Sequence, residues 1–557
     1  MKFTILDCYV DEPACLGVPP YLSPYPRYLA GAIEDAGHEY IYLTIDEYRR
    51  NSDKVAWISE CDALVLLGGA IVPGKYLRGM PASLKEISKI ACGFRGIKVL
   101  GGPIAKFGFL RCANENSNDI EINRLANSFD YIARQDVDCA IFDYLEKGKF
   151  SSRYRTLEEL ETWACRGTKI VKSHPDFPKP LIVEIETYRG CVRYFTGGCS
   201  FCTEPLYGRP RFRKPKDIIN EITELGNLGV VNFRLGAQTC IFCYNLDDTE
   251  LGKTETPKPN VEAIRELFAG IRKNVPHLEV LHVDNANPAI IATYPKESEE
   301  IIRILLENCT PGNVLAFGLE SADKNVAKEN NLNSSAEQTM AAIKLVNKLG
   351  SNRGYNGMPN LLPGINILSG LKGETKDTFE INFAFLKEVF EQGLMLRRIN
   401  IRQVASIRTE FDTKKNYHEF KKFKEKVRNE IDAPMLKRVV PIGTVLRDVY
   451  AEVKIGGITF ARQIGTYPLL VGIPYSLPLE RFYDVAIVSH GQRSVTGIEY
   501  PLKINSAPIK AIECLPGIGS KRAARIVRSR PFHSLESLQK CLDDPSLANS
   551  ILNYIQF

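Results

Sequence analysis

A regular alternation of strand-like and helix-like segments is the feature that most constrains how this chain folds. Between residues 181 and 405 it predicts strands at Leu181–Glu186, Val231–Leu235, Leu278–Val283, Val314–Gly318, Gly364–Leu368 and Arg398–Gln403, with amphipathic helices between them. Strands that alternate with helices form parallel sheets, because each helix returns the chain to the start of the next strand. Six such units predict a partial (β/α)6 barrel, in which the residues that follow each strand build the active site.

The first 150 residues show the same alternation and predict a separate Rossmann-like domain, a doubly wound parallel sheet. Its expected strands are Phe3–Leu6, Tyr40–Thr44, Ala63–Leu67, Ile97–Leu100 and Phe129–Ala133. Ligands of such sheets bind beyond the carboxyl ends of the strands, here near Cys8–Pro13, Gly68–Ala70 and Gly101–Pro103. None of these loops is a G-x-G-x-x-G, so the sequence makes no case for a dinucleotide.

The 557 residues are too many for one hydrophobic core, and the pattern changes at several points. Residues 151–180 are expected to link the first sheet to the barrel, and residues 406–440 to form a basic helical linker. From Gly443 to Leu502, β-branched runs without a helical period predict a small all-β domain over residues 441–505. Short helices are expected over residues 506–557, so the chain combines two α/β domains, an all-β domain and a helical end.

The charge of the chain is balanced overall but uneven along its length. The 72 Lys/Arg and 66 Asp/Glu residues give a net charge of +6. From Arg397 to Arg447 there are 14 basic and 6 acidic residues, and from Ser506 to Lys540 there are 7 and 2. This surplus suits a phosphate-bearing partner, although the run Lys414–Arg428 is equally explained by a solvated helix face.

No segment of the sequence has the length and apolar content of a membrane span. The longest apolar stretch, Asp62–Val72, is about half of what a span requires. The start of the chain passes directly into a strand pattern and lacks the features of a signal peptide. We therefore expect a cytoplasmic protein with no membrane span.

Five of the fifteen cysteines form two clusters, Cys191/Cys199/Cys202 and Cys240/Cys243. The first cluster follows an expected strand, and three thiolates on one loop can hold three irons of a four-iron cluster while the fourth iron stays open for a ligand. A zinc site is the alternative, with Cys240, Cys243 or His174 as the fourth ligand. The third interpretation is three buried cysteines that bind nothing.

The loop that ends at Cys202 resembles the cluster-binding loop of the radical S-adenosylmethionine (radical SAM) superfamily. The usual family spacing is Cys-x3-Cys-x2-Cys; here a longer first interval gives Cys-x7-Cys-x2-Cys, and Phe201 matches the aromatic residue before the last cysteine. The resemblance implies a 4Fe-4S cluster on Cys191, Cys199 and Cys202, with the amino and carboxylate groups of SAM on the open iron. It also implies reductive cleavage of SAM to methionine and a 5′-deoxyadenosyl radical.

Three later strand ends are similar to SAM-contacting segments of the same superfamily. They supply the candidates Gly236, Gln238, Glu320, Ser321, Gly370 and Gly373. The first two follow the second strand, where the family often contacts the SAM amino group, and the next two follow the fourth strand, near the ribose and carboxylate. The two glycines belong to Gly364–Thr375, which resembles the adenine-side segment of the methylthiotransferase-like branch. The resemblance covers about residues 181–405.

Two further groups stand at the same expected mouth of the barrel. Cys240 and Cys243 have two explanations. They are a redox pair or partial ligands of a second cluster, or they are cysteines without a special role. The segment from His282 to Asn287 is explained either by substrate contact or by loop capping. Nothing in the sequence names the catalytic residue that completes a radical reaction.

The first domain resembles the cobalamin-binding-like domain that precedes many radical SAM barrels, since Pro26–His38 is similar to its first helix. The Asp-x-His-x-x-Gly motif is missing, so any cobalamin would bind without a histidine ligand from the protein. In the methylthiotransferase branch the corresponding domain carries three cysteines for an auxiliary cluster; Cys8 suits one of them, and the other two are not assigned. Three states stay open: bound cobalamin, no cofactor and an auxiliary cluster.

Residues 515–527 resemble a helix–hairpin–helix, in which two glycines separate two short helices. The phosphate-binding candidates are Gly517, Gly519, Lys521, Arg522 and Arg525. Backbone N–H groups at the glycines and at the start of the second helix can hold a phosphate without reading sequence, and simple packing of two helices is the alternative. The preceding all-β segment is similar in position and size to the TRAM-type RNA-binding barrel of some radical SAM enzymes.

Together these resemblances imply a radical SAM transferase that methylates or methylthiolates an unactivated carbon of RNA, with tRNA as the expected substrate. RNA and an electron donor such as ferredoxin or flavodoxin are the expected partners. A first alternative keeps the enzyme and changes the substrate to a lipid, a protein or a small metabolite. A second is a nucleic-acid-binding protein whose iron–sulfur cluster is structural or redox-sensing.

Overall fold

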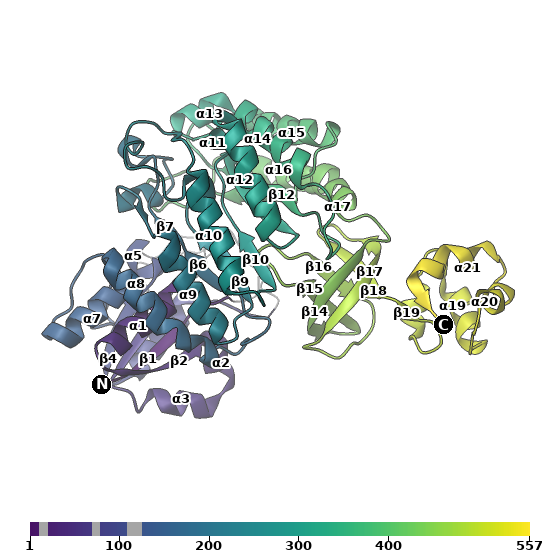
Figure 1. Ribbon diagram of the computed structural model, residues 1–557, viewed down its shortest axis with the longest axis horizontal. Coiled ribbons are helices and arrows are strands. Elements are labelled where there is room, and N and C mark those ends of the chain that lie inside the picture. Colours follow the sequence, from purple (N-terminus) through teal and green to yellow (C-terminus); the bar gives the residue numbers. More distant parts are fainter. Residues whose placement is uncertain (10–20, 70–77, 108–124) are drawn as a thin grey trace.

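The computed structural model describes residues 1–9, 21–69, 78–107 and 125–557. Four units follow one another along the chain (Figure 1): an N-terminal sheet with its helices, a central barrel of parallel strands, a five-stranded barrel, and a helical unit that projects at the C-terminal end. Among the described residues, no helix combines the length and the apolar content that crossing a bilayer requires.

The N-terminal unit is a five-stranded parallel sheet. Its strands are β1 (Lys2–Asp7), β2 (Glu39–Thr44), β3 (Ala63–Leu67), β4 (Ile97–Gly101) and β5 (Tyr131–Ile132), in the order β2-β1-β3-β4-β5. The connecting helices include α1 (Pro24–Asp35), α4 (Leu84–Gly93), α5 (Pro103–Phe107) and α7 (Val137–Lys147). Because the strand order reverses between β1 and β3, the ligand crevice of such a sheet lies beyond Cys8 and Gly68. Residues 10–13 and 70 of the expected ligand loops lie outside the described residues.

The segment expected as a linker, residues 151–180, is instead a packed part of this unit. It contains α8 (Leu157–Arg166) and the 3-10 helix η1 (Gly167–Ser173), and α8 lies against α1. Two glycines allow the contact: a Cβ on Gly31 would lie 2.1 Å from the carbonyl oxygen of Trp163, and a Cβ on Gly167 would lie 1.8 Å from that of Arg27. The linker prediction was wrong because the apolar face of α8 finds its partner far earlier in the chain.

Six parallel strands form the central barrel, as the alternation predicts. They are β6 (Val183–Glu186), β9 (Asn232–Ala237), β10 (Val280–Val283), β11 (Asn313–Glu320), β12 (Leu361–Ser369) and β13 (Arg398–Gln403). They pair as β10-β9-β6 and β11-β12-β13, and a bridge between Ala286 and Phe317 joins the two sheets. The covering helices are α9 (Pro215–Asn227), α10 (Val261–Asn274), α12 (Pro295–Asn308), α14 (Ala336–Gly350) and α15 (Lys376–Glu391) (Figure 1).

Buried ion pairs fasten the N-terminal unit to the central barrel. Arg27 of α1 pairs with Glu221 of α9, and both side chains are fully buried. Arg155 pairs with Asp138 of α7 at 2.6 Å and with Glu186 of β6 at 3.2 Å. A buried charge without a partner costs several kcal/mol, so these pairs fix how the two units meet. They hold the N-terminal unit close to the carboxyl ends of the barrel strands, which we call the mouth of the barrel.

The basic segment expected as a linker, residues 406–440, also packs on the barrel. It forms α16 (Tyr417–Val427), a π-helical turn (Arg428–Asp432) and α17 (Ala433–Val439). Phe420 and Phe423 of α16 are buried, and the Phe423 ring centroid lies 5.6 Å from that of Phe379 of α15. A helix with such an apolar stripe covers a core, so the segment is helical, as expected, and belongs to the layer that covers the barrel.

Residues 445–499 close into a barrel with the strand order β14-β15-β16-β18-β17. The strands are β14 (Val445–Ile455), β15 (Ile458–Gln463), β16 (Leu470–Ile473), β17 (Phe482–His490) and β18 (Ser494–Glu499). The loop between β15 and β16 reaches the central barrel: the Thr466 N–H donates to His282 Nδ1 at 3.1 Å, and the Tyr467 hydroxyl lies 2.7 and 2.8 Å from the two carboxylate oxygens of Asp284. The all-β unit is therefore tied to the central barrel at β10 and the loop that follows it.

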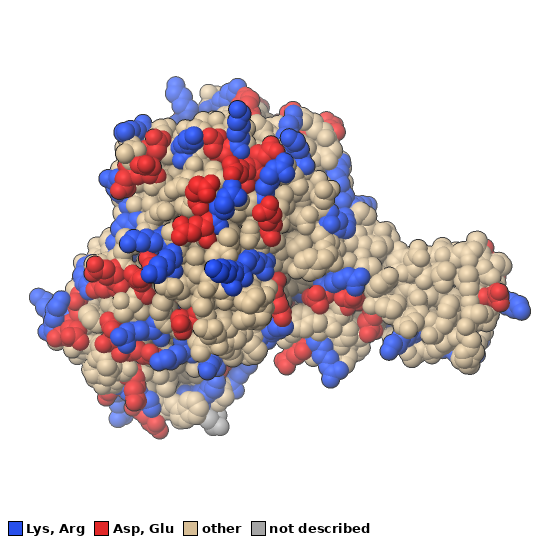
Figure 2. Space-filling view, in the orientation of Figure 1, with Lys and Arg blue, Asp and Glu red and all other residues tan. Residues whose placement is uncertain are grey.

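The C-terminal unit consists of α18 (Ile509–Glu513), α19 (Ser520–Arg528), α20 (Leu535–Cys541) and α21 (Ser546–Ile551). The strands β19 (Leu502–Lys503) and β20 (Ile555–Gln556) pair in parallel, so the unit begins at Leu502 rather than at residue 506. Figure 2 shows acidic and basic side chains intermixed over the barrel helices and few charges on the visible face of this unit. The face in view therefore presents no large surface of one charge sign.

Candidate active site

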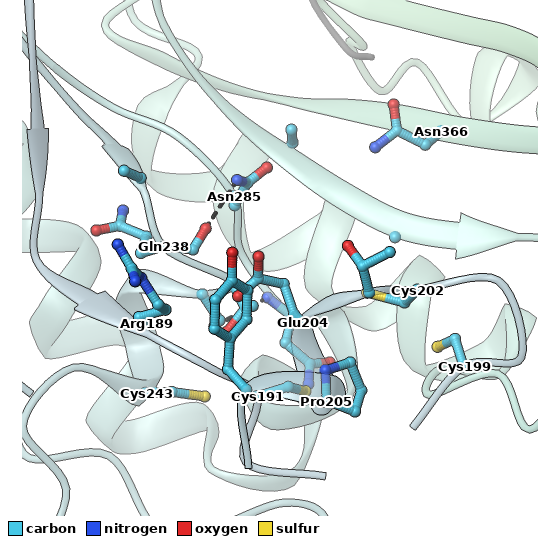
Figure 3. Close-up of a pocket in the computed structure, with 18 of the residues that line it drawn as sticks. Arg189, Cys191, Cys199, Cys202, Glu204, Pro205, Gln238, Cys243, Asn285 and Asn366 are labelled. Carbon is cyan, nitrogen blue, oxygen red and sulfur yellow. Dashed lines mark hydrogen bonds between the residues drawn. The ribbon is translucent and has the colours of Figure 1, made fainter. Parts of the chain in front are cut away.

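A cavity of about 490 Å³ opens between the mouth of the central barrel and the N-terminal unit. The N-terminal unit contributes Ser23, Pro24, Tyr25, Pro103 and Phe107 to its wall. The cluster loop and the ends of the barrel strands supply the rest, including Gln238, Asn285 and Asn366 (Figure 3). The volume is that of a small-molecule site, and the cavity lies where a parallel barrel builds its active site.

All three cysteines of the predicted cluster loop line this cavity. They follow β6 on a loop in which Gly190, Gly197 and Gly198 have φ angles of +100°, +80° and +61°, conformations that glycine adopts without a steric penalty. Burial raises the pKa of the Cys191 thiol to about 12 and also raises that of Cys199. A bound metal reverses this preference, because a coordinated thiol is deprotonated.

The three sulfurs of the cluster loop are not gathered as closely as the ligands of a single zinc ion. Zn–S bonds of about 2.3 Å draw the sulfurs to within about 3.8 Å of one another. Among the described residues, the one group that brings three possible metal ligands within 4.8 Å of one another is Asp136, Asp138 and Cys139. The carboxylates of the two aspartates already pair with arginines. His174, the candidate fourth zinc ligand, stacks on Tyr42 of β2 in the N-terminal unit. Cys191, Cys199 and Cys202 do not all lie within 4.8 Å of one another.

Two arginines hold the cluster loop in place. Arg193 donates from its backbone N–H to Cys191 Sγ at 3.5 Å and from Nη1 to Cys199 Sγ at 3.3 Å, and it pairs with Glu255 at 3.2 Å. Arg408, on the loop after β13, donates to three carbonyl oxygens of the cluster loop. Hydrogen bonds to ligand atoms orient the ligands and tune a metal centre.

Of the six residues predicted to contact SAM, Gln238 and Glu320 lie on the cavity, and so does Phe201, the predicted cofactor-binding residue of the cluster loop. The Gln238 amide accepts from Thr187 and donates to the carbonyl oxygen of Leu235 at 2.9 Å. Glu320 has a φ of +63°, and burial raises its pKa to about 8. A cationic group beside this carboxyl would return it to the ionised form.

The other four predicted residues support the framework of the barrel. A Cβ on Gly236 would lie 2.4 Å from a carboxylate oxygen of Glu184, and the Ser321 hydroxyl lies 3.4 Å from the side-chain oxygen of Asn382. Two more, Gly370 and Gly373, form the turn after β12 with φ angles of +88° and +77°. The cavity lining, as far as the structure describes it, includes none of the four.

Cys240 and Cys243 also line the cavity, on a 3-10 turn after β9. Cys243 lies near Cys191 on the cavity wall (Figure 3). Burial would raise the Cys240 pKa, but hydrogen bonds from Cys243 and from the Asn287 N–H, at 3.2 Å, outweigh it and hold that pKa below its usual range. Burial raises the pKa of Cys243. The structure therefore places both thiols on the cavity wall, hydrogen-bonded to each other.

The sequence analysis missed several polar residues of the cavity, which are Glu204, Asn333, Asn366, Asn400 and Arg402. Asn366 of β12 is in register with Asn400 of β13, and their side chains bond at 3.1 Å. The signal was present in β13, where Arg398, Asn400 and Arg402 occupy every second position. Alternate residues of a strand face the same side, so a polar series of this kind indicates a strand with a polar inner face.

The cysteine that the sequence assigns to an auxiliary cluster in the N-terminal unit is Cys8. Cys8, at the end of β1, is buried, and its thiol contacts the carbonyl oxygen of Leu6 at 3.9 Å. None of the seven histidines, all of which the structure describes, lines the cavity.

The predicted phosphate-binding residues of the C-terminal unit divide into two groups. Gly517, with a φ of +72°, and Gly519, the N-cap of α19, form the turn before that helix. Arg522 already binds within the protein. Its Nε and Nη2 donate to the Asp543 carboxylate at 2.8 Å, and its Nη1 donates to the carbonyl oxygen of Gly517 at 2.9 Å. Arg525 lies 3.6 Å from the same carboxylate, and Lys521 is exposed.

Comparison with known proteins connects this site with a family. The model of the Radical SAM superfamily matches residues 185–386. An uncharacterized protein of Methanocaldococcus jannaschii is 49% identical over 511 residues, 88% of this chain and 92% of its own length. One of Archaeoglobus fulgidus is 42% identical over 97% of each chain. A tRNA-2-methylthio-N(6)-dimethylallyladenosine synthase of Clostridium novyi is 26% identical over 36% of this chain and 38% of its own.

Among solved structures, the cobalamin-dependent S-adenosylmethionine radical enzyme OxsB, with aqua-cobalamin and S-adenosylmethionine bound, aligns over 77% of this chain and 55% of its own. The TM-score is 0.47 and the sequence identity 14%. The family model itself covers the strands β6 to β12 and the loop with Cys191, Cys199 and Cys202. A parallel barrel that carries three cysteines after its first strand and matches this model makes the chain a member of the radical SAM superfamily.

Proposed function

We propose that this protein is a radical SAM enzyme that methylates or methylthiolates an unactivated carbon of RNA, with tRNA as the favoured substrate. The cavity carries the proposal, because it brings Cys191, Cys199 and Cys202 together with Gln238 and Glu320 between two packed units. Superfamily membership supplies the enzyme class, and the appended modules suggest the substrate.

In this proposal Cys191, Cys199 and Cys202 hold a 4Fe-4S cluster and SAM binds beside it. When bound, these groups supply a 5′-deoxyadenosyl radical, which abstracts hydrogen from an unactivated C–H bond. The residues of the chain would provide position: Gln238 would approach the SAM amino group and Glu320 the ribose. Asn285 fixes the Gln238 backbone, because its Nδ2 donates to the Gln238 carbonyl oxygen at 2.9 Å. Walls from two units keep water away from the reacting atoms.

Methylation is the reaction that the described cavity favours. Methylthiolation in the related branch uses an auxiliary cluster, for which Cys8 is the one ligand that the sequence assigns. The wall formed by Tyr25, Pro103 and Phe107 is largely apolar and suits the flat face of a corrinoid. With no histidine on the cavity, such a cobalamin would bind without a protein imidazole and would supply a methyl group to the cavity.

Three observations support RNA as the substrate. The five-stranded barrel has the position and size of an RNA-binding module, and the glycine turn before α19 presents backbone N–H groups of the kind that hold phosphates. The partial relative from Clostridium novyi is named as a tRNA methylthio synthase. Each of these supports a polyanionic substrate more directly than a lipid or a small metabolite.

Anaerobic reconstitution with iron and sulfide, followed by reduction and assay for 5′-deoxyadenosine from SAM, tests the enzyme class. The wild type is expected to form 5′-deoxyadenosine and a Cys191→Ala/Cys199→Ala/Cys202→Ala variant is not. Dithionite and reduced flavodoxin or ferredoxin serve as separate electron sources. Wild-type protein that binds iron but cleaves no SAM with any reductant would instead support a structural or sensing cluster.

Transfer of label from methyl-labelled SAM, with and without added cobalamin, tests the substrate. The expected result is label in the RNA fraction of a cell extract, and label in protein, lipid or metabolite fractions would support the first alternative. Deletion of residues 502–557 is expected to weaken RNA binding and to reduce its dependence on salt. Unchanged RNA binding after this deletion would show that the C-terminal unit does not contribute to RNA binding.

A further inference from the structure

A second group of charged residues lies beside the cavity, on β13 and on the elements that cover it. It comprises Arg398 and Arg402 of β13, Lys424 of α16, Arg428 at the C-cap of α16, and Arg493 on the turn between β17 and β18. We call these five residues the basic seam. Arg402 lines the cavity and Arg493 is exposed, so the basic seam extends from the cavity to the surface.

Hydrogen bonds and ring contacts hold the parts of the basic seam together. Gln492 Nε2 donates to Asn429 Oδ1 at 3.0 Å, which places the turn between β17 and β18 against the end of α16. The Arg398 guanidinium lies 4.4 Å from the centre of the Tyr467 ring. Three separate segments, one from the central barrel, one from its covering helix and one from the five-stranded barrel, therefore meet at this place.

The basic seam lies where the central barrel is incomplete. β13 is the last strand of its sheet, and among the described residues no strand pairs with its outer edge. A six-stranded arrangement lacks the last units of a closed eight-stranded barrel. Residues 406–440 pack on the barrel beside this edge, and Figure 1 shows α16 and α17 between the barrel helices and the five-stranded barrel.

The electrostatics of the basic seam differ from those of the outer helices. Burial, with the charges of Arg428, Arg493 and Arg402, lowers the pKa of Lys424. Burial also lowers the pKa of Arg493; Asp432 acts against this effect, while Arg428 and Arg398 add to it. Over the outer helices, by contrast, red and blue side chains alternate (Figure 2). Cations gathered at one partly buried place repel one another, and a bound anion relieves that repulsion.

We propose that the basic seam binds the phosphodiester backbone of a single RNA strand and leads the target nucleoside to the cavity at Arg402. This inference rests on the proposed function, which supplies the reaction. It adds the path by which the RNA substrate reaches the cavity. Enzymes that act on a base take it out of the helical stack, so an unpaired strand beside the cavity is what the chemistry requires. Arginines, four of the five cations, match phosphate oxygens with forked donors.

Binding of a fluorescently labelled single-stranded RNA to the full-length reconstituted protein, measured over a range of salt concentrations, tests the proposal. The test variant is Arg428→Gln/Arg493→Gln. If each residue contacts one phosphate, the slope of log K against log salt falls by about 1.4, and affinity at 0.1 M salt falls on the order of tenfold. The control variant, Lys273→Gln/Lys344→Gln, removes two charges from exposed positions of α10 and α14 and is expected to keep the wild-type slope.

The possible outcomes separate this proposal from the proposed function. A wild-type slope and affinity in the test variant overturn the path along the basic seam, even when the protein cleaves SAM. An equal loss in the control variant, or competition by polyglutamate as strong as that by unlabelled RNA, overturns the choice of RNA as the ligand of this surface. Absence of SAM cleavage overturns the proposed function alone, since the binding experiment does not depend on it.

Discussion

Arg193 donates hydrogen bonds to two of the three cysteine sulfurs at the mouth of the barrel, through its backbone N–H to Cys191 and through Nη1 to Cys199. Positive charge and hydrogen bonds at ligand sulfurs stabilise the reduced form of an iron–sulfur cluster and so raise its reduction potential. We expect Arg193→Met to lower the midpoint potential of the reconstituted protein by on the order of 50 mV. A redox titration followed by electron paramagnetic resonance measures the change.

Arg408 provides the matched control for this prediction. It approaches the same loop but donates to carbonyl oxygens instead of sulfur atoms. Arg408→Met is therefore expected to loosen the loop and to shift the potential much less. Equal shifts in both variants would mean that the overall loss of positive charge, rather than the sulfur contact of Arg193, sets the potential.

The buried ring of His282 predicts an acid-sensitive contact between the central barrel and the five-stranded barrel. Burial lowers the pKa of His282 to about 4, and its Nδ1 accepts the Thr466 N–H. Between about pH 6.5 and pH 4 the unfolded chain binds a proton here that the folded chain does not. The contribution of His282 to the free energy of unfolding is therefore fully present above pH 6.5. It falls by about 3 kcal/mol as the pH drops toward 4.

Thermal unfolding of the wild type and of His282→Gln at several pH values measures this contribution. We expect the variant to be less stable at pH 7 and to lose less stability than the wild type between pH 6.5 and pH 4.5. His533→Gln, at an exposed position of the C-terminal unit, is the control and should follow the wild-type curve. A His282→Gln curve parallel to the wild type would contradict the assignment.

The sequence predicted those features that depend on neighbours along the chain. The six barrel strands followed from local alternation, and the cluster loop followed from three cysteines within twelve residues, Cys191 to Cys202. Their place on the cavity agrees with the rule that residues after parallel strands form the active site. Gln238 and Glu320 lie on the cavity for the same reason.

Features that depend on distant contacts were not predictable in this way. The partner of Asp284 is Tyr467, 183 residues later, and nothing near either residue indicates the pair. Arg522 looked free to bind phosphate, but Asp543 engages it after an intervening helix. Residues 151–180 looked like a linker because the contact of α8 depends on Gly31, more than a hundred residues earlier.

The hydroxyl of Tyr467 predicts a second test of the contact between the two barrels. It donates to the buried carboxylate of Asp284, which also pairs with Arg234 at 2.5 Å. Tyr467→Phe removes a hydrogen bond to a charged group and is expected to cost about 2 kcal/mol. The control is Tyr483→Phe, because that hydroxyl bonds to the carbonyl oxygen of Pro478 near the surface. A similar fall in thermal stability for both variants would show that the buried Tyr467 hydrogen bond stabilises the protein no more than the surface bond of Tyr483.

The approach of α1 to α8 at Gly31 gives a steric prediction for the N-terminal unit. A Cβ at this position would lie 2.1 Å from the carbonyl oxygen of Trp163, so Gly31→Ala has to push the two helices apart. Alanine favours a helix over glycine by about 1 kcal/mol, yet overpacking of this kind costs roughly 3 kcal/mol, and the net effect is a loss of stability.

Gly93 near the end of α4 is the matched control, since a Cβ there meets nothing within 4 Å. Gly93→Ala is expected to leave stability unchanged or to raise it by up to about 1 kcal/mol. Thermal unfolding of both variants decides between sterics and helix preference. If Gly31→Ala were as stable as Gly93→Ala, α1 and α8 would not be held at the close distance that the backbone contact requires. That result would contradict the packing of residues 151–180 against the N-terminal unit.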